Sequence, residues 1–104
     1  MRFILGPESP AKNYQLRRAD LDKIFETIKF APLDRKRELQ AYEFIKNNYE
    51  TVQIHAPFIP LLTFGHPIRF EGKHRLHALK KLGCKEIAVG VHKLMDTKYL
   101  EFLL

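Results

Sequence analysis

Residues 68–91, IRFEGKHRLHALKKLGCKEIAVGV, decide most of the fold predicted for this sequence. They read in order as a strand, a glycine, a helix, a second glycine and another strand. Gly83 follows the helical pattern where helices commonly end in a left-handed residue, so we expect a helix over residues 73–82. Apolar residues alternate over 87–91, as in a strand with one buried face. The stretch therefore predicts a strand–helix–strand unit.

The rest of the chain adds helices and short strands to this unit. Asp20 and Asp34 stand where helix N-caps are expected. In chain order, we expect a strand over 2–5, a loop, helices over 20–29 and 34–48, a strand around 52–54, a hairpin of 59–64 with 68–71, and a last helix, capped by Asp96, that contains Tyr99, Leu100, Leu103 and Leu104. This order predicts a mixed α/β domain of the α+β type, with a small mixed sheet and flanking helices.

Composition limits the organisation of the chain. Its 104 residues, 45% of them hydrophobic, suit a single domain over 1–104 with a real core. The longest uncharged apolar stretch, 54–64, contains Pro57 and Pro60 and is far shorter than the roughly 20 residues of a spanning helix, so we expect no membrane partner. The single cysteine, Cys84, cannot form an internal disulfide and suits a reducing compartment, so we expect a cytoplasmic location.

Positive charge is concentrated in one window. The net charge is +6, and residues 66–85 carry +5 of it. The basic residues there are Arg69, Lys73, Arg75, Lys80, Lys81 and Lys85, against Glu71 alone. Such a patch favours an anionic partner, namely a nucleotide, a nucleic-acid backbone or an acidic protein surface. A solvated helix face is the alternative.

The junction at Gly72 indicates phosphate binding. A glycine lets backbone approach a ligand closely, and the helix that follows presents free N–H groups and a positive dipole end. Lys73, His74 and Arg75 add side-chain donors at the same end.

Arg75 raises a separate question, because the helical wheel places it near the middle of the buried arc. A buried guanidinium needs a partner. That partner is either a carboxylate, from Glu71 or the first helix, or a ligand phosphate held bidentately. On the opposite face, we expect Lys73, His77 and Lys81 in solvent.

The residues FEGKHR at 70–75, followed by LHALKKLG and a strand that begins Glu86-Ile87, resemble the signature of the ParB/sulfiredoxin superfamily. The resemblance is strong over about 24 residues, and it implies a ParB/sulfiredoxin-like domain over most of the chain, with 34–48 as an inserted helix. It implies ATP, ADP or CTP at the Gly72 junction, with His74 and Arg75 on the phosphates. Glu71 matches an acidic residue of the free serine kinases, which makes it the candidate catalytic residue and a candidate ligand for Mg²⁺ that arrives with the nucleotide.

Two departures from the family pattern limit the functions that the resemblance implies. Sulfiredoxin has its nucleophilic cysteine where this chain has Lys73, and Cys84 lies beyond the helix, so we do not expect sulfinic acid reduction. Chromosome-partition ParB proteins add DNA-binding and dimerisation domains, for which 104 residues leave no room. The expected function is that of a stand-alone nucleotide-binding module, of a form that occurs on phages and plasmids, with NTPase or phosphotransfer activity left open.

Two alternatives use the same basic window. The first is a nucleic-acid-binding protein in which Arg69, His77, Lys80 and Lys81 contact a DNA backbone. The second is a non-catalytic inhibitory module that binds an acidic host protein. We expect no dedicated metal site, because no cluster of His and Cys has the spacing of a structural zinc site.

Two further patterns remain open in the sequence. Phe58, Phe64 and Phe70 flank the basic window, where they either stack on bases or fill the core, and the core is favoured. Positive charge at 35–37, at the expected start of the second helix, is disfavoured by the helix dipole. It indicates either a partner or a solvated turn.

Overall fold

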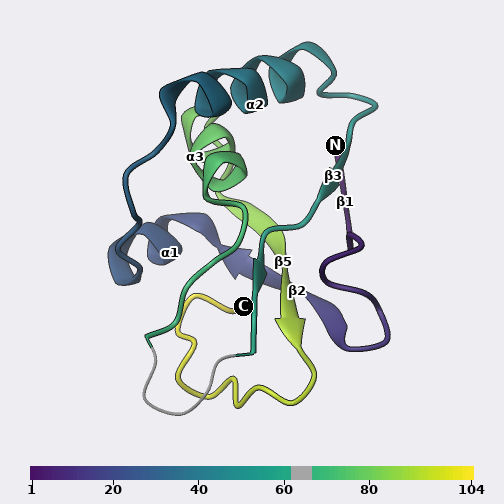
Figure 1. The fold of residues 1–104 in the computed structure, drawn as a ribbon, viewed down its shortest axis with the longest axis vertical. Coiled ribbons are helices and arrows are strands. Elements are labelled where there is room, and N and C mark those ends of the chain that lie inside the picture. The colour runs from purple at the N-terminus through teal and green to yellow at the C-terminus, as the bar shows by residue number, and fades with distance from the viewer. Residues whose placement is uncertain (62–66) are drawn as a thin grey trace.

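The computed structural model describes residues 1–61 and 67–104, which form two small open β-sheets with helices packed around them (Figure 1). Within these residues the elements are β1 (Arg2–Ile4), β2 (Tyr14–Asp20), α1 (Leu21–Thr27), α2 (Arg35–Asn47), β3 (Gln53–His55), β4 (Phe58–Ile59), α3 (Lys73–Lys81) and β5 (Glu86–His92). The predicted α+β class is confirmed.

Strand β5 is the centre of the larger sheet, whose strand order is β2-β5-β4. It pairs with β2 antiparallel over seven residues, from Glu86 opposite Asp20 to His92 opposite Tyr14. On its other edge it pairs with β4 in parallel. Parallel neighbours need a crossover connection, and α3 provides it. In the second sheet β1 pairs in parallel with β3.

The core lies between α3 and β5. Leu76 and Leu79 of α3 are fully buried and belong to the same cluster as Val89 and Val91 of β5. Helix α1 contributes the buried Leu21 and Ile24, and α2 contributes the buried Ile45. Figure 1 shows α2 above α3 at one end of the molecule, away from β2.

The helix ends follow the sequence signals. The Asp20 carboxylate accepts a hydrogen bond from the Lys23 N–H at 3.1 Å, and the Asp34 carboxylate accepts one from the Lys36 N–H at 2.9 Å. Gly72 and Gly83 flank α3 with φ angles of 98° and 86°, both in the left-handed region. The predicted helices at 20–29, 34–48 and 73–82 are therefore confirmed, with ends that differ by a few residues.

Strand β2 lies between the predicted loop and the predicted first helix, where no strand was expected. Its apolar residues do not alternate clearly, since Leu16 is exposed and the charged Arg17 and Arg18 follow it. The strand forms because the whole length of β5 offers it backbone partners, a long-range pairing that a local pattern does not contain.

The predicted hairpin of 59–64 with 68–71 is wrong in its second arm. Residues 68–70 form no strand, and Glu71 alone makes an antiparallel bridge, to Phe58. The first arm is the short β4, which stops before Pro60, a residue without an N–H to donate. Residues 62–66 of the prediction lie outside the described residues.

The predicted C-terminal helix after Asp96 is also wrong. The segment consists of turns, and Leu103 makes an antiparallel bridge to Ala19. The Leu104 N–H donates to the Arg18 carbonyl at 3.0 Å, so the chain end continues along the free edge of β2. That edge satisfies backbone groups that a helix would have satisfied internally.

Within the described residues, no helix is both long enough and apolar enough to cross a membrane.

Replacement of Phe102 tests the extended course of the C-terminus. Phe102 is 2% exposed and its ring centre lies 5.5 Å from that of Phe70. We expect Phe102→Ala to lower the free energy of unfolding by about 3–5 kcal/mol, because it opens a cavity in the core. Leu104→Ala is the matched control, with an expected change within about 0.5 kcal/mol, because Leu104 is exposed. Urea unfolding measures both changes. A larger loss of stability in Leu104→Ala than in Phe102→Ala would contradict the extended course of the C-terminus.

Candidate functional site

A cavity of about 860 Å³ opens beside the start of α3. The linker between α1 and α2, one side of α2, and the segment from Arg69 into α3 form its walls. Of the residues predicted to bind phosphate or to act on it, the cavity brings together Arg69, Glu71, Gly72, Lys73, His74 and Arg75. It does not include His77, Lys80 or Lys81.

Arg75 is half-buried in the wall of this cavity. Burial lowers the pKa of its guanidinium, and the negative charges of Glu8 and Glu71 oppose that shift. Within the described chain, however, no carboxylate oxygen lies within 4.0 Å of the Arg75 nitrogens. The ion pair that the sequence offered as one partner for Arg75, with Glu71 or with a carboxylate of the first helix, is therefore not formed.

The Arg75 side chain lies directly over Gly72. A Cβ atom built on Gly72 would be 2.6 Å from Arg75 Nη2 and 3.0 Å from Nε. Only glycine combines this close approach with a φ of 98° at little cost. Arg75 also borders a second, smaller cavity of about 220 Å³, beside the loop that contains Glu8. Arg75 thus borders two openings.

Lys73 and His74 hold the linker that precedes α2. Lys73 Nζ donates to the Pro32 carbonyl at 2.8 Å, and the Asp34 N–H donates to His74 Nε2 at 3.1 Å. A ring nitrogen that accepts a hydrogen bond carries no proton, so the bond requires neutral His74 in its Nδ1–H tautomer. Burial is the largest cause that lowers the pKa of His74, followed by the charges of Arg37 and Lys73. Both side chains thus shape the cavity wall.

The cavity is positively charged. Five cationic side chains border it, against the carboxylates of Glu8 and Glu71: Lys29, Arg37, Arg69, Lys73 and Arg75. Arg69 Nη2 lies 3.4 Å from Glu71 Oε1, so this predicted catalytic carboxylate is already paired.

Several members of the site were not predicted from the sequence. They are Lys29, Arg37, Glu8 and the apolar residues of α2 that face the cavity. The disfavoured positive charge at 35–37 was a signal for Arg37. No local signal marked Glu8, because it approaches Arg75 from the opposite end of the chain.

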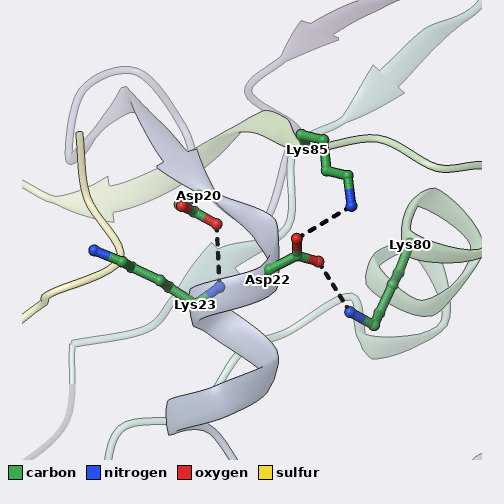
Figure 2. A network of polar contacts seen from close by, with 5 residues as sticks. All are labelled: Asp20, Asp22, Lys23, Lys80 and Lys85. Carbon is green, nitrogen blue, oxygen red and sulfur yellow. Dashed lines mark hydrogen bonds and ion pairs between the residues drawn. The ribbon is translucent and has the colours of Figure 1, made fainter.

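The cations of α3 and of the turn after it that lie outside the cavity have partners within the domain. Lys80 Nζ lies 3.1 Å and Lys85 Nζ 3.3 Å from the carboxylate oxygens of Asp22, beside the capping bond of Asp20 (Figure 2). These two hydrogen bonds lower the pKa of Asp22. Lys81 Nζ lies 4.6 Å from the centre of the Tyr42 ring.

The helical wheel predicted that His77 lies on a solvent face, and this prediction is wrong, because aromatic residues partly cover its ring. Its ring packs edge-on against Phe25 and Phe30, with ring centres 4.8 and 5.1 Å away, and its Nδ1 lies 2.8 Å from the Lys73 carbonyl oxygen. The linker that carries Phe30 covers this face of α3, which the sequence of the helix alone does not reveal.

Two of the aromatic residues near the basic window belong to the core. Phe58 and Phe70 are each 7% exposed, and Phe64 lies outside the described residues. In the described ranges, no three His, Cys, Asp or Glu side chains come together as a metal site. His66, one of the histidines of the window, falls outside those ranges.

No protein-family model matches this chain, and comparison with curated proteins and with solved structures likewise found no match.

The bond between Asp34 and His74 predicts a pH dependence. The folded state lowers the pKa of His74 from its ordinary 6.5, so the unfolded chain binds more protons once the pH falls below 6.5. The stability that neutral His74 contributes is fully present above that pH and is lost as the pH falls toward the lowered pKa. His74→Gln keeps an acceptor for the Asp34 N–H but does not titrate.

We therefore expect wild-type protein to lose more free energy of unfolding than His74→Gln between about pH 7.5 and about pH 5. Urea unfolding at several pH values measures the difference between the two proteins, which removes the shared contribution of other groups. Parallel curves would contradict a neutral His74 that accepts from the Asp34 N–H.

Proposed function

We propose that the cavity binds the phosphate groups of a nucleotide and that Arg75 is their principal ligand. The observation that carries this proposal is a half-buried guanidinium in the wall of a cationic cavity, with no carboxylate of the described residues within 4.0 Å. Desolvation of a charge is costly unless a partner compensates for it. A phosphate is such a partner, because a guanidinium can bind two of its oxygens at once.

The surroundings of Arg75 support a phosphate over a smaller anion. Lys29, Arg37 and Arg69 border the same cavity, so several oxygens could be bound together. The cavity volume of about 860 Å³ falls in the range of small-molecule sites. The resemblance of residues 70–75 to the ParB/sulfiredoxin signature supports the same assignment, since it implies phosphate at Gly72, His74 and Arg75.

The residues of the cavity indicate what it binds more clearly than they indicate a reaction that it catalyses. Glu71 pairs with Arg69, and Glu8 is the other carboxylate at the cavity. Either could occupy one position on a Mg²⁺ ion that arrives with the nucleotide, because Mg²⁺ at phosphates needs only one or two carboxylates. The proposal is therefore a nucleotide-binding domain of ParB/sulfiredoxin type, and turnover requires a separate assay.

Arg75→Met tests the role of the guanidinium. Methionine keeps much of the side-chain volume and removes the desolvated charge, so we expect the variant to fold with a melting temperature at or above that of wild type. It should lose at least about tenfold in affinity for ATP or CTP, a loss of about 1.4 kcal/mol. Isothermal titration calorimetry and thermal unfolding measure the two effects.

Lys85→Met is the matched control, because Lys85 is an exposed cation outside the cavity. Its nucleotide affinity should stay within about twofold of wild type, since exposed charges at a distance are screened. A folded Arg75→Met that binds nucleotide as wild type does would reject the proposal. A large loss of stability in the same variant would instead show a structural ion pair.

The two left-handed glycines provide a second test. Gly72→Ala and Gly83→Ala impose similar backbone strain, of order 1–2 kcal/mol. Only the new methyl at Gly72 would meet Arg75, because nothing lies within 4 Å of a Cβ at Gly83. We expect both variants to lose stability to a similar extent, while Gly72→Ala alone weakens nucleotide binding. Calorimetry that shows equal affinity in the two variants would contradict this role of Gly72.

A further inference from the structure

We propose that α2 provides the binding surface for the base of the nucleotide and that the base stacks on Phe44. The inference rests on the proposed function, because it assumes that the phosphates bind at Arg75. It assigns a role to a helix that the sequence presented only as an insertion.

One stripe of α2 faces the cavity. Arg37, Gln40, Ala41 and Phe44 all border it, and their spacing of three and four residues places them on the same side of the helix. Ile45, one residue further, is buried in the core. The helix is therefore held by one side, and a neighbouring side is presented to the cavity.

Phe44 is the exposed aromatic residue of this stripe. Its side chain is 59% exposed, whereas Phe58 and Phe70 are each 7% exposed. A large apolar ring in water gains free energy when a flat partner covers it, and each base has an aromatic face that can do so. Gln40, on the same stripe, has an amide that both donates and accepts, as the polar edge of a base requires.

The two kinds of wall define the chemistry of the occupant. Arg69, Lys73 and Arg75 line one part of the cavity, and Ala41 and Phe44 line another. Inorganic phosphate would use only the cationic part. A molecule that joins a flat aromatic ring to a phosphate chain would use both, and a free nucleoside phosphate has this chemistry.

A nucleic-acid strand shares that chemistry, and a third cavity allows the two to be distinguished. This cavity, of about 570 Å³, shares Lys29 and Arg69 with the first and contains Tyr99, which is 73% exposed. A strand that extended from the first cavity into this one would meet Tyr99. A mononucleotide held between Arg75 and Phe44 would not.

The experiment compares ligands with and without a base. Wild type, Phe44→Ala and Arg75→Met are titrated by calorimetry with ATP, CTP, GTP and UTP and with inorganic tripolyphosphate. We expect Phe44→Ala to weaken the best nucleotide by about 5- to 150-fold, which is the range for loss of one base–aromatic stack. Its affinity for tripolyphosphate should equal that of wild type, whereas Arg75→Met should lose both ligands.

Leu39→Ala is the matched control, because Leu39 is also exposed on α2 but lies outside the cavity. Phe44→Trp retains an aromatic face and should retain nucleotide binding. Because Phe44 is exposed, its replacement leaves the core intact.

Each contrary result has a distinct meaning. Unchanged nucleotide affinity in Phe44→Ala, with binding still lost in Arg75→Met, would overturn the role of Phe44 and leave phosphate binding in place. Unchanged affinity in Arg75→Met would overturn the proposed function itself. Tighter binding of a ten-residue oligonucleotide than of any nucleotide, lost in Tyr99→Ala, would overturn the assignment of a free nucleotide.

Discussion

The structure depends on the close approach of β4 to the central strand β5. Gly90 makes this approach possible, because a Cβ there would lie 2.9 Å from the Cβ of Phe58, its partner in β4. Phe58 bonds in turn to the backbone of Glu71, through the Glu71 N–H at 2.8 Å. Glu71 is joined directly to Gly72, where α3 begins. The pairing in the sheet thus fixes, through a few backbone bonds, where the first turn of α3 and Arg75 must lie.

The same first turn places a charge where it is costly. Burial lowers the pKa of Arg75, and the nearest carboxylates, Glu8 and Glu71, offset that effect without forming an ion pair within 4.0 Å. Proteins keep such groups where a ligand compensates for them, and stability is commonly lower at binding sites for that reason. The contrast with Lys80, paired with Asp22 at 3.1 Å, shows that the fold can supply a carboxylate to a cation of α3.

The features that could be predicted from the sequence are those that interactions between near neighbours in the chain determine. Asp20 and Asp34 cap their helices, and Gly83 ends α3, because these residue types satisfy particular backbone groups at particular positions. Prediction from the sequence failed where a distant segment of the chain provides the partner. The β2 strand and the extended C-terminus both form along backbone edges from other parts of the chain, and Phe30 covers His77 through a linker. For the same reason the window at 70–75 was found, but the stripe of α2 that faces it was not.

The linker before α2 couples the two parts of the proposed site. Lys73 and His74 belong to the same helical turn as Arg75, and they bond to the backbone of Pro32 and Asp34. Asp34 in turn caps α2, through the N–H groups of Lys36 and Arg37. The helix that carries Arg75 therefore also orients the helix that carries Phe44. If the proposed nucleotide binds there, the distance between its phosphate and base subsites is set by these bonds in advance, which lowers the entropic cost of binding. Lys73 and His74, which the sequence assigned to phosphate contacts, would contribute to the proposed binding by this route, through the position of the wall.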